Sequence, residues 1–302
     1  MSQLDVKGGM RAFANGQNVM DYLRRRHGIN HNTSDIIELS YDLQAGTYAK
    51  TTELHIQERL DYTKLMSEFI RPHLNGATSL LDVGTGELST ISLLANHLDN
   101  NTTVVAFDIS WSRLFKGQEF WNKWNKNNTL KLNSFVADMK EIPLLDNSVE
   151  VVISNHSLEP NGQYLKQILP EIFRVCSQVC VLFEPSFELN SAEGQARMAK
   201  HGYIRNLQQE SEALGGTVLS VELFPLTHSK INPTACYVIA PPKHSKMSTN
   251  SINQFSVPGT NLPLTPMDDF LFSKDMALAF PILKNIPVLR SDKAILATAL
   301  LD

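Results

Sequence analysis

The sequence predicts an α/β protein built on a doubly wound, mostly parallel sheet, and three observations support this fold class. Short apolar runs alternate with stretches of helical apolar periodicity, the pattern of strands joined by helical crossovers. The last two runs, 217–223 and 235–240, have no helix between them and are typical of an antiparallel hairpin. The chain has 302 residues, 42% of them hydrophobic, and can therefore bury one large core.

The order of the runs defines seven strands and the helices between them. The expected strands are 79–82, 103–108, 132–137, 149–154, 178–183, 217–223 and 235–240. The expected helices are 19–26, 53–74, 88–98, 164–175 and 193–214. Residues 41–48 combine turn residues with aromatic ones, and we expect either a packed connector or a contact to a ligand.

A glycine turn follows the first strand. Gly84 and Gly86 stand one residue apart after the apolar run and before a helical stripe, in the strand-turn-helix arrangement that brings backbone close to a nucleotide. Ser89 occupies the place of the third glycine of the dinucleotide fingerprint, which argues against NAD and oxidoreduction.

Polar residues also follow the next three strands. Asp108 ends the second strand and is suited to accept hydrogen bonds from two ribose hydroxyls. Asp138 and Met139 follow the third strand and offer a carboxylate and an apolar side chain to an adenine ring, and Asn155 follows the fourth. Because ligands bind at the carboxyl edge of open α/β sheets, we expect these residues to line one site. Each of them taken singly would also fit a structural role, as a steric corner, a loop acid or core filler.

These motifs resemble the class I S-adenosylmethionine-dependent methyltransferases over residues 50–240. The matching pieces are Leu81-Asp82-Val83-Gly84-Thr85-Gly86, Phe107-Asp108, Ala137-Asp138-Met139 and Ile153-Ser154-Asn155-His156. The resemblance implies a Rossmann-like methyltransferase fold and S-adenosyl-L-methionine as the cofactor. It also implies that Asp82 orients the glycine turn and the amino group of the cofactor's methionine part.

Two proton acceptors lie in the loop after the fourth strand. His156 has an ordinary pKa near 6.5, suited to a general base at neutral pH, and Glu159 is three residues away. A satisfied core histidine and a glutamate that merely begins the next helix are the structural alternatives. Further along, Tyr203 and Arg205 could bind the acceptor, arginine through its bidentate fork, although a surface helix would also explain this pair.

The acceptor is expected to be a small molecule, such as a sugar or a carboxylated metabolite. Methylases of nucleic-acid bases carry Asn or Asp, two prolines and an aromatic after the fourth strand, whereas here Asn155-His156-Ser157-Leu158 stands there. The net charge of −4 also gives no general attraction for nucleic acid. The alternatives are a tRNA, rRNA or protein methyltransferase, and a non-catalytic scaffold that binds the cofactor.

The composition also bears on domains and location. We expect a helical cap at 1–75, a cofactor-binding domain at 76–241, a polar linker at 241–251 and a small α+β module at 252–302. No transmembrane run or signal peptide is evident, so we expect a cytoplasmic protein. The three cysteines suggest no disulfide framework, and we expect no bound metal.

The module at 252–302 has a second resemblance. Its segment 279–289 resembles the strand pair of the small zinc-ribbon activator of translation-related methyltransferases, but the cysteines of that ribbon are absent. A module this small rarely stabilises itself from its own core. We therefore expect it to pack either against the larger domain or against a second subunit, as a homodimer contact.

Overall fold

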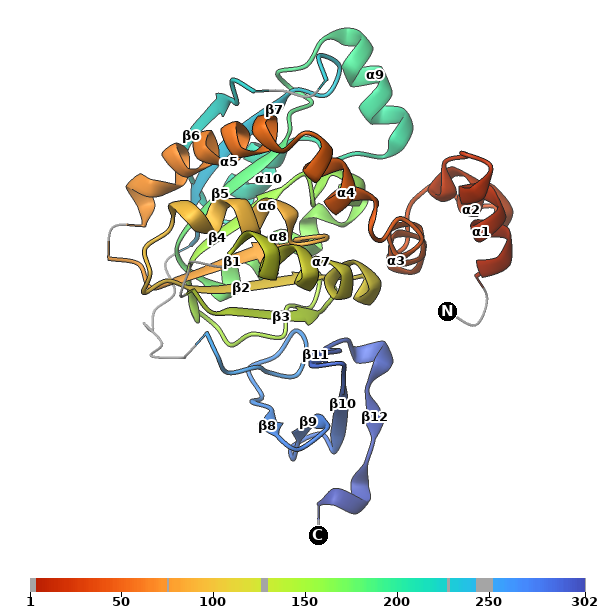
Figure 1. Ribbon diagram of the computed structural model, residues 1–302, viewed down its shortest axis with the longest axis vertical. Coiled ribbons are helices and arrows are strands. Elements are labelled where there is room, and N and C mark those ends of the chain that lie inside the picture. The colour runs from red at the N-terminus through yellow and green to blue at the C-terminus, as the bar shows by residue number, and fades with distance from the viewer. Residues whose placement is uncertain (1–3, 75, 126–129, 227–228, 243–251, 302) are drawn as a thin grey trace.

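The computed structural model describes residues 4–74, 76–125, 130–226, 229–242 and 252–301. A central sheet carries helices on both faces, the first three helices form a lobe at one side, and the C-terminal strands lie below the sheet (Figure 1). Residues 243–251 of the expected linker lie outside the described residues.

Within the described residues the main sheet has seven strands in the order β3-β2-β1-β4-β5-β7-β6. The strands are β1 (Ser79–Val83), β2 (Thr103–Asp108), β3 (Leu132–Val136), β4 (Val149–Asn155), β5 (Cys176–Pro185), β6 (Thr217–Leu223) and β7 (Thr234–Ala240). Strands β1 to β5 are parallel, and β7 runs antiparallel to both β5 and β6. The predicted fold class and strands are confirmed, with ends shifted by a residue or two.

This strand order places a ligand site at one edge of the sheet. The chain proceeds outward from β1 to β2 and β3, then returns to the other side of β1 with β4 and β5. The carboxyl ends of β1 and β4 therefore flank the point where the strand order reverses. In open α/β sheets that point is the crevice where ligands bind.

Successive residues of the central strands pack on opposite faces. Leu80 and Val104 join the core beneath α5 (Ile56–Ile70), α6 (Ser89–Leu94) and α7 (Trp111–Trp124). Leu81 and Val105 join the core beneath α8 (Leu165–Val175) and α10 (Leu207–Ala213). Strand β1 is buried along its whole length, as expected for a parallel strand covered on both faces.

The N-terminal helices differ from the predicted pattern. They are α1 (Val6–Ala14), α2 (Val19–His27), α3 (Ser34–Asp42), α4 (Thr47–Leu54) and then α5. The single helix predicted at 53–74 is wrong, because the backbone of His55 leaves the helical region (φ −118°, ψ 36°) between α4 and α5. Leu54, counted as part of the apolar stripe, is 73% exposed. Residues 41–48, expected to form either a packed connector or a ligand contact, hold the end of α3, a turn at Gly46 and the start of α4.

One further helical stretch is divided, and another is found as predicted. The helix predicted at 193–214 breaks into α9 (Ala192–His201) and α10, because Gly202 takes a left-handed conformation (φ 69°) that ends α9. The helix predicted at 164–175 corresponds to α8, which a short 3-10 turn, η3 (Glu159–Tyr164), precedes. Apolar periodicity alone did not reveal the break at Gly202.

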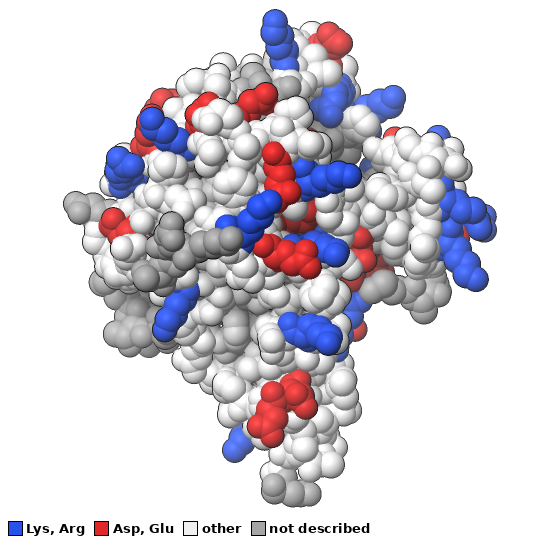
Figure 2. All heavy atoms as spheres, viewed as in Figure 1, with Lys and Arg blue, Asp and Glu red and all other residues white. Residues whose placement is uncertain are grey.

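The molecular surface carries charges of both signs. Figure 2 shows acidic and basic side chains interspersed over the face of the sheet domain. Among the described helices, none combines the length and the apolar character that a membrane crossing requires.

The C-terminal module packs against the outer edge of the main sheet. It contains β8 (Thr265–Pro266), β9 (Phe270–Ser273), β10 (Leu278–Leu283), β11 (Ile286–Pro287) and β12 (Ile295–Leu296). Val288 pairs with Val136 as a parallel bridge, and the amide of Leu289 donates to the carbonyl of Val136 at 2.8 Å. Phe280 and Leu289 are buried in the same core as α8. The module thereby covers the edge strand β3, whose unpaired backbone would otherwise be exposed.

One buried arginine joins this module to the N-terminal helices. Arg290 is 5% exposed and donates to Glu38 of α3 at 2.5 Å and to Asp292 at 2.9 Å. Lys293 adds a weaker ion pair to Glu38 at 3.7 Å. Burial raises the pKa of Glu38, and the charges of Arg290 and Lys293 oppose that rise.

Replacing Arg290 by alanine should destabilise the protein strongly, because the carboxylate of Glu38 would stay buried without its main partner. We expect a loss of about 3 kcal/mol in the free energy of unfolding at pH 8, measured by urea denaturation. The loss should become smaller as the pH is lowered, because burial raises the pKa of Glu38 and the variant loses the Arg290 charge that opposes this rise. The control Lys293→Ala should cost less than about 1 kcal/mol. Equal, small losses for both variants would contradict the assigned role of Arg290.

Candidate cofactor pocket and active site

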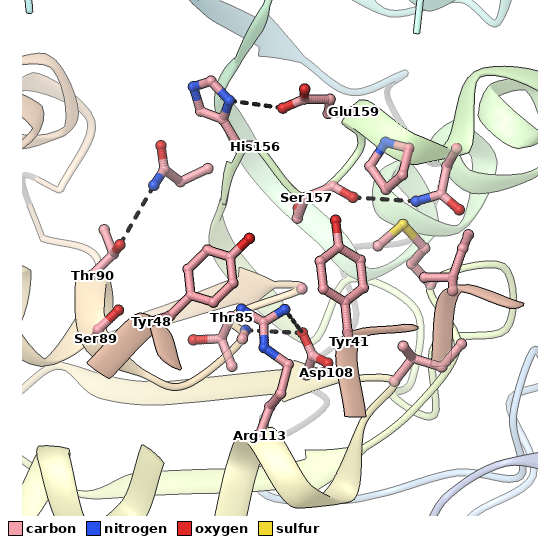
Figure 3. Close-up of a pocket in the computed structure, with 18 of the residues that line it drawn as sticks. Tyr41, Tyr48, Thr85, Ser89, Thr90, Asp108, Arg113, His156, Ser157 and Glu159 are labelled. Carbon is pink, nitrogen blue, oxygen red and sulfur yellow. Dashed lines mark hydrogen bonds and ion pairs between the residues drawn. The ribbon is translucent and has the colours of Figure 1, made fainter. Parts of the chain in front are cut away.

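A cavity of about 510 Å³ lies at the carboxyl edge of the sheet, where the topology predicts a ligand site. Its floor comes from the glycine turn and from the ends of β2, β3 and β4, and its roof from α3, α4 and α5 (Figure 3). The predicted residues that line it are Gly84, Gly86, Asp108, Asp138, Met139, Asn155, His156, Glu159 and Tyr203. The structure therefore brings nine of the eleven predicted site residues to one cavity.

The glycine turn has no room for side chains. Gly84 and Gly86 have positive φ angles of 69° and 62°. A Cβ atom on Gly84 would lie 2.5 Å from the Cβ of Ser157, and one on Gly86 would lie 2.4 Å from Nη2 of Arg113. Both glycines are thus required by conformation and by close approach.

Asp82 lies outside the pocket lining. It is 5% exposed within β1, and burial raises its pKa to about 7. Its position below the glycine turn is compatible with orienting that turn rather than with open contact to a ligand.

Asp108 connects the second strand to the glycine turn. One carboxylate oxygen accepts from the amide of Gly86 at 2.9 Å, and the other accepts from the amide of Ser110 at 2.9 Å. A carboxylate has about four lone-pair sites, so Asp108 retains acceptor capacity toward the cavity.

Asp138 and Met139 form the wall after β3. The carboxylate of Asp138 accepts from the hydroxyl of Ser34 on α3 at 2.6 Å and from the amide of Lys140 at 3.0 Å. The Cε of Met139 lies 3.4 Å from the place a Cβ on Gly84 would occupy. The pair thus presents a polar and an apolar surface beside the glycine turn.

Asn155 is held by two neighbouring elements. Its Oδ1 accepts from the hydroxyl of Tyr62 on α5 at 2.8 Å, and its Nδ2 lies 3.5 Å from Oγ1 of Thr90 on α6. These contacts fix the amide where β4 ends, next to the cavity.

The side chains of His156 and Glu159 contact one another. Nδ1 of His156 lies 2.9 Å from Oε2 of Glu159, and Nε2 lies 2.7 Å from Oγ1 of Thr234 on β7. Asn232 donates to the other oxygen of Glu159 at 3.2 Å. Burial opposes a charge on His156, but the hydrogen bond and the negative charge of Glu159 raise the pKa of the imidazole above its ordinary value. Both ring nitrogens are therefore engaged in the structure.

A buried carboxylate supports the loop that carries this pair. Glu184, at the end of β5, accepts from the amides of Ser157 and Leu158 at 3.1 Å and from that of Glu159 at 3.2 Å. Burial raises the pKa of Glu184 to about 7. It satisfies the amides that begin η3 and so determines where Glu159 stands.

Tyr203 and Arg205 have different positions although they are two residues apart. Tyr203 lines the cavity and hydrogen-bonds to Glu159, and burial raises its pKa to about 12. Arg205 lies outside the pocket lining, is exposed, and stacks over the ring of Phe187 at 5.2 Å.

The roof is tied to the floor by polar contacts that the sequence did not indicate. Glu87, 1% exposed, accepts from the amides of Tyr48 and Ala49 at 3.3 and 2.8 Å and so caps the start of α4. Asp42 at the end of α3 accepts from the hydroxyl of Ser110 at 2.8 Å. We call α3 and α4 together the lid.

Arg59 and Arg113 line the cavity and Glu87 supports its lid, and none of the three was singled out from the sequence. Glu87 and Arg113 have recognisable positions, since one follows the glycine turn directly and the other stands in the first turn of the helix after Asp108. Arg59 of α5 also lines the cavity. Its position in an ordinary amphipathic helix carries no local signal.

Comparisons with known proteins agree with this architecture. Residues 81–183 match a family model described as a methyltransferase domain. No curated protein matches the sequence.

Solved structures are similar to this chain over part of its length. A magnesium protoporphyrin IX methyltransferase from Synechocystis PCC 6803 with bound SAH has 12% identity and a TM-score of 0.48, covering 61% of this chain and 84% of that one. A geranyl diphosphate C-methyltransferase from Streptomyces coelicolor A3(2) has 13% identity and a TM-score of 0.44, covering 59% and 77%. A SAM-dependent methyltransferase from Aquifex aeolicus has 19% identity and a TM-score of 0.39, covering 54% and 81%.

The contact between His156 and Glu159 should make stability depend on pH. Because the pKa of His156 is raised in the folded protein, its stabilising contribution is complete below about pH 6.5 and is lost as the pH rises through the folded value. Glu159→Gln should therefore cost about 1 kcal/mol more unfolding free energy at pH 5.5 than at pH 8.5.

The measurement is urea denaturation at the two pH values, with Glu159→Gln in a His156→Asn background as the control. In that background the pH dependence of the loss should disappear. If Glu159→Gln in the protein that retains His156 lowers the unfolding free energy equally at both pH values, the charge of the imidazole does not interact with Glu159.

Proposed function

We propose that this chain, of which residues 81–183 match a methyltransferase-domain model, is a class I S-adenosylmethionine-dependent methyltransferase that acts on a small-molecule acceptor held beside Glu159. The observation that carries the proposal is a cavity that reaches from the glycine turn to Glu159 and Tyr203 beneath the lid. A cavity roofed by helices suits a small acceptor better than a folded RNA or protein. The interspersed surface charges and the net charge of −4 also argue against nucleic acid as the acceptor (Figure 2).

The cofactor would lie on the floor of the cavity. In our proposal Asp108 accepts from the ribose hydroxyls, Asp138 from the adenine amino group, and Met139 covers the ring. Gly84 and Gly86 let the methionine part approach the backbone, which Asp82 orients from below. Asn155, fixed by Tyr62, faces the same floor.

Methyl transfer from a sulfonium is an in-line displacement, and the protein must align the acceptor and remove its proton. We propose Glu159 as the group that takes the proton. His156 positions this carboxylate through Nδ1, and Asn232 holds its other oxygen. Tyr203, which hydrogen-bonds to Glu159, would contact the acceptor.

The three parts of the chain would have separate roles. We propose that residues 1–75 act as the cap, residues 76–241 hold the cofactor, and residues 252–302 protect the edge of the sheet and support the cap through Arg290. The contact of Arg290 with Glu38 supports the last of these roles.

The decisive experiment uses S-adenosylmethionine with an isotopically labelled methyl group, the purified protein and a small-metabolite extract, with products identified by mass spectrometry. Glu159→Gln should lower the rate of label transfer about 100-fold or more and leave cofactor binding nearly unchanged, because only proton removal is lost. Asp108→Ala should weaken cofactor binding about tenfold or more in calorimetry.

Arg205→Ala serves as the surface control for both measurements, because its side chain lies outside the cavity. Label that appears only in RNA or protein fractions would refute the proposed acceptor class. Cofactor binding without transfer to any fraction would favour a cofactor-binding scaffold.

A further inference from the structure

Arg113 occupies the cofactor floor in an unusual way. It belongs to the first turn of α7, is 8% exposed and lines the cavity. Its guanidinium group lies against the glycine turn. It occupies space that is open only because Gly86 has no side chain. Figure 3 shows the guanidinium beside Asp108, with the rings of Tyr41 and Tyr48 on either side.

The surroundings of Arg113 balance its charge, but its Nε–H is left without a hydrogen-bond partner in the part of the chain that the structure describes. Nη1 lies 3.9 Å from Oδ2 of Asp108, and Nε lies 4.0 Å from Oε1 of Glu87. Both separations are beyond hydrogen-bonding distance. Within the described residues, the buried Nε has no hydrogen-bond partner.

The two neighbouring carboxylates cannot simply move closer. Asp108 is fixed by the amides of Gly86 and Ser110, and Glu87 is fixed by the amides at the start of α4. A guanidinium has five N–H donors, and leaving even one of them, here the Nε–H, unpaired in a buried place is unfavourable. The arrangement is what a binding site for an oxygen-bearing ligand group requires.

The tyrosines hold this group in place without using its donors. The guanidinium carbon lies 4.8 Å from the ring centre of Tyr41 and 4.6 Å from that of Tyr48. Contacts of this kind are made through the ring faces, so the N–H groups in the guanidinium plane remain available. The two rings come from α3 and α4, so both helices of the lid contact one cation.

We propose that Arg113 is a cofactor-binding residue that donates to the ribose hydroxyl oxygen which Asp108 binds. This inference rests on the proposed role of Asp108. A hydroxyl donates one hydrogen bond and accepts two, so a single oxygen can donate to Asp108 and accept from Arg113. The 3.9 Å between Nη1 and Oδ2 leaves both atoms within reach of one such oxygen. The pair then recognises a sugar hydroxyl, not merely a negative charge.

A cofactor bound to Arg113 would also affect the lid, because Tyr41 and Tyr48 of the lid pack on the same guanidinium group. When the cofactor fills the donors of Arg113, the guanidinium is fixed between floor and ligand, and the rings of Tyr41 and Tyr48 gain a rigid surface to pack on. Cofactor release then requires this stack to separate. Loss of Arg113 should accordingly accelerate release as well as weaken binding.

The test is calorimetric titration with S-adenosylhomocysteine and with its 2′-deoxy and 3′-deoxy analogues. Arg113→Met, which keeps an unbranched apolar side chain, should bind S-adenosylhomocysteine at least about tenfold more weakly, as expected for a lost hydrogen bond to a charged donor. The deoxy analogue that lacks the hydroxyl contacted by Arg113 should bind the natural protein much more weakly than S-adenosylhomocysteine does. In Arg113→Met this difference in affinity between the two ligands should be much smaller. Arg113→Lys should restore part of the affinity, since it returns the charge without the planar fork.

Arg205→Met is the matched control, because Arg205 also stacks on one aromatic ring but lies outside the cavity. It should bind all three ligands as the natural protein does. Thermal unfolding without ligand shows whether Arg113→Met is folded, and if it is not, Arg113→Lys carries the comparison.

The inference is overturned if Arg113→Met loses affinity by the same factor for S-adenosylhomocysteine and for both deoxy analogues. The arginine would then affect the fold of the site and not the recognition of a ribose hydroxyl. Unchanged affinity in Arg113→Met overturns it as well. If the natural protein itself does not bind S-adenosylhomocysteine, the proposed function fails. If the natural protein binds it and only the arginine comparison fails, the proposed function stands.

Discussion

The hydrogen bond from the amide of Gly86 to the carboxylate of Asp108 is the constraint on which the site depends. It joins the turn after β1 to the end of β2, so two neighbouring parallel strands present backbone and carboxylate to the same cavity. The bond is possible only because Gly86 has a positive φ angle and no side chain to displace Arg113. The carboxylate of Asp108 that holds the turn also lines the cavity. A substitution of Asp108 would therefore change both the conformation of the turn and the groups available to a ligand.

Local pattern was sufficient to predict the floor of this site. The apolar runs before Asp108 and Asp138 are buried parallel strands, and parallel strands bring their carboxyl ends to one edge whatever the details of the loops. Gly84 and Gly86 were recognisable because few other residues adopt their conformation. Predictions of this kind depend on the geometry of one strand and its turn, and such geometry is encoded within about ten residues.

The roof and the catalytic end could not be predicted in the same way. Glu87 caps a helix 38 residues earlier in the chain, and Arg290 reaches Glu38 across 252 residues. No periodicity encodes such contacts, because each partner alone looks like an ordinary charged surface residue. The break at His55 separates α4, whose first amides donate to Glu87, from α5, and no local pattern marked it. Tyr203 and Arg205 differ in position because only tertiary packing decides which of them faces the cavity.

Three of these long-range contacts are made by α3, and they hold this helix of the lid at its start, middle and end. Its start is held by Asp138 after β3, its middle by Arg290 of the C-terminal module, and its end by Ser110 after β2. Two of these anchors, Asp138 and the loop after Asp108, are also parts of the cofactor floor. A cofactor that binds Asp138 through its adenine amino group must compete with the hydroxyl of Ser34 for that carboxylate or share it. If Asp138 binds the cofactor as proposed, the position of α3 depends on occupancy of the floor at its start and on the C-terminal module through Arg290 at its middle.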